Sequence, residues 1–454
     1  MNLAKLNVNK KLFSLFALIV LIGATPPVLF ILSPIKSFSV GCLIVACLGL
    51  LFSLRRSKTL SSLSRRKLPL IFFVLLYLFT QHIIVGSWQT KSYSSILPLA
   101  IMITSAYLVA QEIAHLNSKL VLKAFIWAYY FFAAVGIFNI ASNYSIGKTL
   151  GYTHAQPIFP FLEPSHYALY FGTLAFIYSA LQPSIIKKSM SIALLVAMSM
   201  TIPNTTLLTY ACLSTLLLIF NLRPKAVFFA LPAFTISIIF GVNAVLSNEY
   251  FSKRLDVSAS ENQNTTTLVY LQGVQDAINS LSLTNGMGLG FQMLGTQPPS
   301  EYSYSIAKLV TDANGELNRQ DGGFLAAKII AEFGVTGLAA IFSFILLAAK
   351  AFIQTRRLSK ENIDHTKTKA ILFNAIAISF SIEMFIRGYG YFSPGFYLFL
   401  IALFYIAHQK LIDKKNSKSR KDILTSISHQ NNSPQSKASH SDLRSQRSTI
   451  IEAN

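Results

Sequence analysis

Glu163, Ser165 and His166 lie within four residues of one another, at the point where a polar stretch meets an apolar one. A carboxylate and an imidazole at such a boundary can act as a general base or orient a hydroxyl group. The alternative is structural, because an acidic residue and a serine ahead of an apolar helix can also cap its free amides. Pro164 suits the first helical turn under either interpretation. The residue types alone leave the two interpretations equal.

A second group of polar residues lies near the end of a late apolar segment. Glu383 and Arg387 are four residues apart, a spacing that predicts one shared helix face. Charges so close to hydrocarbon commonly face a cavity or a partner, and the alternative is an ion pair between these two residues. The aromatic residues beyond them would form either a membrane-interface belt or a surface for stacking sugars. These are Tyr389, Tyr391 and Phe392.

The longest polar segment between apolar ones spans residues 247–323, and Arg254 and Arg319 lie towards its two ends. Guanidinium groups match phosphate oxygens in a planar, bidentate geometry. Together with Arg387, these arginines would suit a diphosphate ligand. The outer polar segments contain no paired histidines, HExxH motif or aspartate cluster, so we expect chemistry that needs neither a metal nor another cofactor.

The same segment contains its own helical pattern. Apolar residues recur at three- and four-residue spacing, which predicts a short amphipathic helix lying on the membrane or over a cavity. They are Leu268, Leu271, Val274, Ile278 and Leu281, preceded by polar residues 264–267 that can cap the helix. The glycine-rich run 285–290 lacks the strand and βαβ context of a phosphate-binding loop, so we expect a turn or a close backbone approach there.

The elements that position these residues must lie in a membrane. The chain has 454 residues, of which 52% are hydrophobic and only 13% charged, and its mean hydropathy is +0.49. Soluble proteins carry about 25% charged residues. The net charge of +21 would suggest nucleic-acid binding in a soluble protein, but here Lys and Arg cluster in short loops and the C-terminal tail. This distribution is typical of a membrane protein whose basic loops lie on the cytoplasmic side, and we expect no nucleic-acid partner.

Apolar runs of membrane-spanning length predict an all-α polytopic membrane protein. The spans are 12–32, 37–54, 68–86, 95–112, 119–141, 166–182, 190–221, 226–246, 324–352, 370–386 and 394–408. The run 190–221 is either one long helix or two short ones that turn at residues 203–206, where Pro is followed by Asn and Thr. Two helices place every basic loop on one side, which the positive-inside rule favours.

The resulting topology has about twelve transmembrane helices in a single domain, residues 1–408, with both termini cytoplasmic. The polar loops 142–165 and 247–323 then lie outside the cytoplasm. Residues 409–454 are rich in Ser, Lys, Asn, Gln and Arg, which predicts a disordered, basic cytoplasmic tail. The two halves do not align as an inverted repeat, which disfavours a transporter.

Several short motifs occur in a characteristic order along this topology. They are Phe161-Leu162-Glu163-Pro164-Ser165, Arg254, Gly286-Met287-Gly288-Leu289-Gly290, Asp321-Gly322-Gly323-Phe324-Leu325, residues 330–338 and Arg387-Gly388-Tyr389-Gly390-Tyr391-Phe392. With the helix count and loop placement, the chain up to about residue 408 resembles the bacterial O-antigen polymerase (Wzy-type) family, which is related to O-antigen ligases. The resemblance implies a GT-C-like integral-membrane glycosyltransferase of the bacterial inner membrane.

The resemblance also implies a substrate and a reaction. Such enzymes join oligosaccharide repeat units carried on undecaprenyl diphosphate into O-antigen, capsule or another surface polysaccharide, and a chain-length regulator can be a partner. The chain departs from many relatives at Thr265 to Thr267, where they carry an arginine. It departs from the ligases at Arg319 to Asp321, where they carry a histidine, and this favours a polymerase.

We therefore expect an inverting glycosyl transfer outside the cytoplasm. Glu163 would deprotonate or orient the acceptor hydroxyl, with His166 or Asp321 as alternatives for that role. The diphosphate would be bound by Arg254, Arg319 and Arg387. The supporting residues would be Glu383, Tyr389 and Tyr391. The competing hypotheses are a ligase that transfers glycan to lipid A-core and a flippase or other transporter of lipid-linked oligosaccharides.

Overall fold

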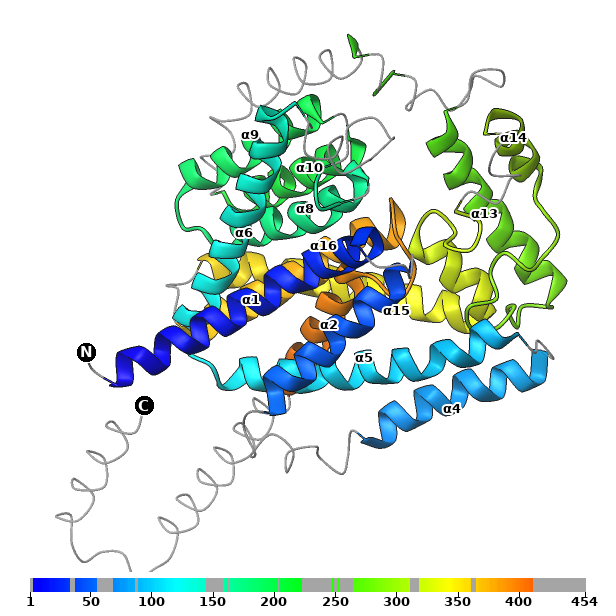
Figure 1. Ribbon diagram of the computed structural model, residues 1–454, viewed down its shortest axis with the longest axis horizontal. Coiled ribbons are helices and arrows are strands. Elements are labelled where there is room, and N and C mark those ends of the chain that lie inside the picture. The colour runs from blue at the N-terminus through cyan, green and yellow to red at the C-terminus, as the bar shows by residue number, and fades with distance from the viewer. Residues whose placement is uncertain are drawn as a thin grey trace, which may run out of the picture. The chain divides into compact units, whose positions relative to one another are not determined.

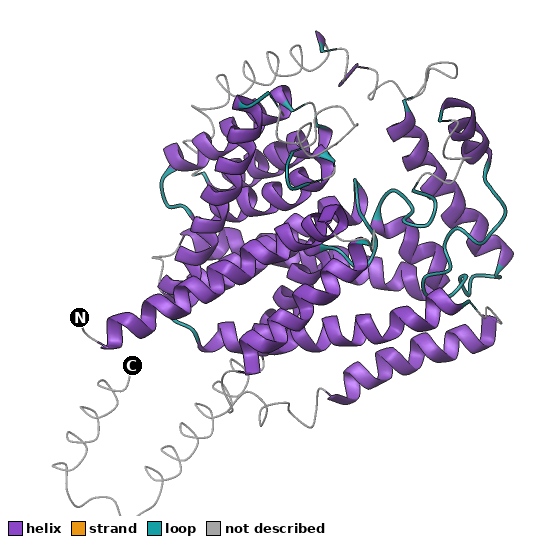
Figure 2. Ribbon diagram, in the orientation of Figure 1, coloured by secondary structure: helices purple, strands orange, loops and turns teal. Residues whose placement is uncertain are grey.

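The computed structural model shows a helical protein. It describes residues 3–32, 37–54, 68–85, 89–143, 158–161, 163–202, 204–222, 247–248, 251–252, 264–310, 318–360 and 365–410. Within these ranges the regular secondary structure is all helix, connected by loops and turns (Figure 2). By its internal contacts the chain divides into residues 1–405 and 406–454. The second unit is described only as far as residue 410, so residues 411–454 of the predicted tail lie outside the described residues, and residues 409 and 410 are helical.

Twelve helices carry labels in Figure 1. The first six are α1 (Leu3–Leu32), α2 (Phe38–Leu54), α4 (Leu68–Val85), α5 (Thr90–His115), α6 (Ser118–Ala141) and α8 (Pro164–Leu181). The others are α9 (Ile185–Thr201), α10 (Thr205–Asn221), α13 (Thr265–Leu283), α14 (Glu301–Leu309), α15 (Leu325–Lys360) and α16 (His365–Phe385). The backbone is helical again from residue 394.

The apolar helices make this a helical membrane protein. Among the described residues, five helices are long and apolar enough to cross a membrane. They are α5, α6 and the segments Val8–Ile31, Leu325–Ser359 and Lys367–Phe385 of α1, α15 and α16. Shorter apolar helices include Phe38–Leu54, Phe72–Val85 and Thr205–Asn221. The predicted span 226–246 lies outside the described residues, and the count of twelve spans stays a prediction.

The region 190–221 forms two helices, as the turn chemistry predicts. The helix α9 ends at Thr201 and α10 begins at Thr205. Asn204 is the N-cap residue of α10, and its side-chain oxygen accepts hydrogen bonds from the backbone amides of Thr206 and Leu207 at 2.9 and 3.3 Å. These bonds satisfy two of the free amides at the start of the helix, which stabilises the break at this position.

The helix α8 lies at the centre of the packing. Apart from Pro164 and His166 in its first turn, every residue of α8 is buried. It packs against α6, α9, α10 and α16. Because α8 begins directly after Glu163, this residue is attached to one of the best-packed elements of the molecule.

The helix α13 forms where the periodicity predicts it, and Asn264 caps it by accepting a hydrogen bond from the Thr266 amide at 2.9 Å. Its predicted apolar face packs on the protein only in part. Leu268 is 2% exposed and packs against Ile306, whereas Val274 and Ile278 are 37% and 59% exposed and the side chains of Gln272 and Asp276 are buried. The outward apolar residues in the middle of α13 suit a helix whose outer surface meets lipid.

The glycine-rich run makes the close backbone approach that its composition predicts. It packs against a break in α15 at Gly334, whose φ of 60° and ψ of −133° are not helical. The amide of Val335 donates to the carbonyl of Gly286 at 2.8 Å, and the amide of Gly290 donates to the carbonyl of Glu332 at 2.9 Å. The break thus joins the first turns of α15 to the segment that follows α13.

Candidate active site

Most of the predicted site residues lie around one polar cleft of about 480 Å³. Its walls come from the ends of α1, α2 and α5, the start of α8, the turn before α15 and the segment after α16. The lining residues are Phe30, Ser37, Phe38, Ser39, Lys91, Glu163, His166, Asn318, Gln320, Asp321, Gly323, Arg387, Gly388, Tyr389 and Phe392. Of the predicted residues, Glu163, His166, Asp321, Arg387 and Tyr389 are therefore brought together. Arg254 lies outside the described residues.

Glu163 occupies the N-cap position of α8, but its side chain does not cap the helix. Instead, its Oε2 accepts a hydrogen bond from Ser165 Oγ at 2.8 Å and another from Arg387 Nη2 at 3.0 Å. The Nε2 atom of His166 lies 3.9 Å from the same oxygen. The side chain of Glu163 is 52% exposed to the cleft, and Oε1 has no partner among the described residues. The carboxylate is thus held in place by one oxygen and open to a ligand at the other.

His166 and Tyr389 form an aromatic wall of the cleft with Phe38. The rings of Phe38 and Tyr389 stack with centroids 5.1 Å apart, and the His166 ring meets Tyr389 edge-on at 4.3 Å. The Nδ1 atom of His166 is buried without a hydrogen-bond partner among the described residues. A flat aromatic surface beside a carboxylate suits the apolar face of a sugar ring, and the stacking role of Tyr389 stays a prediction.

Arg387 does not share a helix face with Glu383, contrary to the prediction from their spacing. The helix α16 ends at Phe385, and the amide of Arg387 donates to the carbonyl of Ile382, five residues back, at 3.0 Å, which is outside the helical pattern. Glu383 is buried at 3% exposure, with its carboxylate against Gly395, whereas Arg387 pairs with Glu163. Tyr391 is also buried, with its ring beside Phe291 and Phe333. Glu383 and Tyr391 therefore lie behind the cleft.

The turn before α15 supplies the opposite wall. The amides of Asp321 and Gly322 donate to the carbonyl of Asn318 at 3.1 and 2.9 Å, and the amide of Gly388 donates to the carbonyl of Gly323 at 3.0 Å. The last bond attaches the Arg387 segment to this turn. Arg319 is 5% exposed, and its guanidinium donates to the carbonyl of Gln297. The structure does not bring Arg319 into the cleft, although its neighbours Asn318 and Gln320 line it.

Lys91 and Lys328 are two cationic residues that the sequence analysis does not single out. Lys91 lines the cleft from the first turn of α5 and donates to the side-chain oxygen of Gln320. Lys328 is 2% exposed and donates to the carbonyl of Gln320 at 2.6 Å, with Asp321 at 3.7 Å and Glu332 at 3.8 Å. Lys91 provides a second cation in the cleft, and Lys328 anchors the turn that carries Asp321.

No protein-family model, curated protein or solved structure matches the chain. The chemistry of the cleft follows from its own groups. Arg387 and Lys91 can bind an anion, because Arg387 uses one N–H group on Glu163 and has four others. Glu163 can accept a hydrogen bond from a hydroxyl group at Oε1, and the aromatic wall can contact a sugar. These groups suit a phosphorylated carbohydrate.

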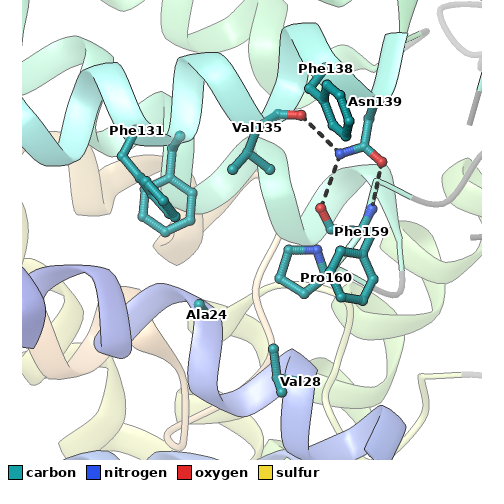
Figure 3. Close-up of a pocket in the computed structure, with 9 residues that line it drawn as sticks. Ala24, Val28, Phe131, Val135, Phe138, Asn139, Phe159 and Pro160 are labelled. Carbon is teal, nitrogen blue, oxygen red and sulfur yellow. Dashed lines mark hydrogen bonds between the residues drawn. The ribbon is translucent and has the colours of Figure 1, made fainter. Parts of the chain in front are cut away.

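A separate apolar cavity of about 330 Å³ lies between α1 and α6 (Figure 3). Ala24 and Val28 of α1 face it, together with phenylalanine rings of α6 and the segment 158–161. Its one polar side chain is that of Asn139, and both ends of this amide already have hydrogen-bond partners. Its Nδ2 donates to the carbonyl of Phe159 at 3.1 Å, and its Oδ1 accepts from the amide of Phe159 at 3.0 Å. A cavity with no available polar group suits a hydrocarbon chain. The segment that covers it leads within two residues to Glu163.

Glu163 should remain charged throughout the neutral pH range. Burial raises the pKa of this carboxyl, but His166, Arg387 and the hydrogen bonds from Ser165 and Arg387 bring the pKa below its ordinary value. A lowered folded-state pKa means that the pairing stabilises the protein above the unfolded-state pKa and is lost as pH falls through the folded-state value.

We therefore expect the difference in thermal stability between the wild type and Glu163→Gln to be constant above roughly pH 6, to fall as the pH drops below the unfolded-state pKa of about 4.3, and to vanish only below the lowered folded-state pKa. Thermal unfolding of the detergent-solubilised protein, followed by intrinsic fluorescence across this range, measures that difference. A difference that grows as the solution becomes more acidic would contradict the assignment of Glu163 as the paired, ionised group.

Proposed function

We propose that the protein is an integral-membrane glycosyltransferase that polymerises oligosaccharide repeat units carried on undecaprenyl diphosphate. The observation that carries this proposal is the meeting of Glu163, Arg387 and Lys91 in one cleft at the ends of apolar helices. A carboxylate, two cations and an aromatic wall provide groups for an acceptor hydroxyl, a diphosphate and a sugar ring. The product is a surface polysaccharide such as O-antigen or capsule.

In the proposed reaction, Arg387 and Lys91 bind the diphosphate of the donor and offset the charge that develops on it as it leaves. Glu163 accepts a hydrogen bond from the acceptor hydroxyl. The oxygen of this hydroxyl attacks the anomeric carbon from the side opposite the departing diphosphate. The new bond joins the acceptor oxygen to that carbon, the bond to the diphosphate oxygen breaks, and the configuration inverts. Because Glu163 has a lowered pKa, its first effect is to orient the hydroxyl, and it receives the proton as the new bond forms.

The apolar helices and the cavity between α1 and α6 support a lipid-linked substrate. Hydrocarbon of the carrier would lie among these helices while its diphosphate head occupies the cleft. The proposed topology has about twelve spans in a GT-C-like arrangement, with both termini cytoplasmic and the cleft on the periplasmic side of the inner membrane. The charge distribution of the sequence supports this orientation. A chain-length regulator is the proposed protein partner.

The test is an assay of the purified, full-length protein in proteoliposomes with a lipid-linked repeat unit and, separately, with lipid A-core added. We expect longer lipid-linked glycans to appear with the repeat unit alone. Product on lipid A-core would indicate a ligase, and transfer of intact substrate across the membrane without a new bond would indicate a flippase. Either of these two results would overturn the proposal.

A further inference from the structure

A further hollow lies apart from the cleft and from the cavity between α1 and α6. This crevice of about 540 Å³ lies between α6, α8 and α9. Its lining residues are Tyr129, Tyr130, Ala133, Ala134, Ile137, Tyr178, Lys187, Met190, Ser191 and Leu194. The helix α8 contacts both α6 and α9 and contributes Tyr178 to the lining.

One end of the crevice is polar and the other is apolar. The phenol groups of Tyr130 and Tyr178 are hydrogen bonded at 3.0 Å, and Lys187 lies in the first turn of α9. Seven residues further along their helices, Ile137 and Leu194 line the apolar end. Tyr130, Tyr178 and Lys187 line the same crevice and are among its polar groups. Seven helical residues span about 10 Å, which is enough for several methylene groups.

The crevice is open on its outer side rather than towards the protein interior. Tyr130 is 53% exposed, Met190 is 66% exposed and Ile137 is 51% exposed, although all three belong to apolar helices. The alanines at positions 133 and 134 create the hollow, because larger side chains there would fill it. Ala133 is 6% exposed and Ala134 is exposed, so a lipid chain lying over Ala134 would cover apolar surface that the protein leaves open.

We propose that this crevice binds a phospholipid with an anionic headgroup. The ammonium group of Lys187 and the phenol of Tyr130 would contact the headgroup, and one acyl chain would lie along Ala133, Ala134 and Leu194. The positive charge selects an anionic headgroup over a zwitterionic one, because a lysine at the membrane surface contributes about 1 kcal/mol to binding anionic lipid, which is about a fivefold effect. The N-terminus of α9 at the same end adds the positive pole of its dipole. This site is separate from the cleft and does not depend on the proposed function.

The test uses the purified full chain, stripped of lipid in detergent, with equal amounts of dioleoyl phosphatidylglycerol and dioleoyl phosphatidylcholine. Native mass spectrometry measures which lipid is retained. We expect the wild type to retain phosphatidylglycerol preferentially and Lys187→Ala to lose about fivefold of this preference. Lys119→Ala is the matched control, because Lys119 is also exposed, lies in the first turn of α6 and does not line the crevice.

Equal losses of phosphatidylglycerol preference in Lys187→Ala and Lys119→Ala would overturn the proposal, because they would show that any lysine near the lipid attracts the anionic headgroup. Ala134→Leu, which fills the hollow from an exposed position, should lower the retention of both lipids, and unchanged retention would also overturn it. Tyr130→Phe provides a variant that removes one hydroxyl group at an exposed position and should lower phosphatidylglycerol retention. Unchanged retention in Tyr130→Phe would remove that phenol from the headgroup site and overturn the assignment.

Discussion

Glu163→Gln is expected to lower the rate of glycan elongation by about 10²- to 10⁴-fold, the usual contribution of a positioned acid–base group. The amide has the shape of the carboxylate and can still accept a hydrogen bond from Ser165. It lacks the negative charge that binds Arg387 and that attracts the proton of the acceptor hydroxyl. The measurement is the elongation of lipid-linked repeats in proteoliposomes, at equal amounts of inserted protein.

Glu301→Gln is the control for this experiment. Glu301 is an exposed carboxylate at the start of α14, in the other long polar segment (247–323), and it does not line the cleft. Equal elongation by the Glu163→Gln and Glu301→Gln proteins would reject the proposed role of Glu163. A double-mutant cycle with Arg387→Gln separates two roles. If Glu163 acts only by holding Arg387, the double variant will be no slower than Arg387→Gln alone.

Gly334→Ala is expected to destabilise the protein by about 3 kcal/mol or more, because two costs combine at this position. Its φ of 60° and ψ of −133° lie in a region that residues with side chains rarely adopt. A Cβ atom at position 334 would also lie 1.9 Å from the carbonyl oxygen of Gly286. The break in α15 and the glycine-rich run would have to separate.

Thermal unfolding of the purified protein, together with its monodispersity in detergent, measures this effect. Ala340→Val is the control, because Ala340 lies on the same helix with its side chain exposed. We expect the control to unfold at the wild-type temperature. An unchanged unfolding temperature in Gly334→Ala would show that the close contact with Gly286 is not required for the fold.

Local chemistry predicts local structure well in this chain. The turn between α9 and α10 and the cap of α13 depend on Asn204 and Asn264, whose side chains bond to amides two or three residues away. The outward orientation of α13 could not be predicted in this way. Periodicity identifies which residues share a helix face, but it does not say whether that face meets protein or lipid.

In the candidate site, too, the residue types can be predicted from the sequence but their spatial pairing cannot. The motif around Glu163 and the charged residue Arg387 are visible in the sequence, but their pairing joins residues 224 positions apart and depends on where α16 ends. Arg319 was predicted from its residue type, yet its guanidinium is buried on a backbone carbonyl. Lys328 and Glu332 did carry a signal, because two charges four residues apart inside an apolar span commonly mark a functional region.

The outward apolar face of α13 has a consequence for how a substrate reaches the cleft. This helix lies against the turn that lines one wall, since Gly273 approaches the carbonyl of Gly322 and Gly323 approaches the carbonyl of Val269. If lipid covers the outer side of α13, an amphiphile diffusing in the bilayer can reach this wall from the side. Its head group then contacts the cleft while its chains stay in the hydrocarbon of the membrane. Its capture is then a two-dimensional search, whose rate follows surface density in the leaflet rather than concentration in water.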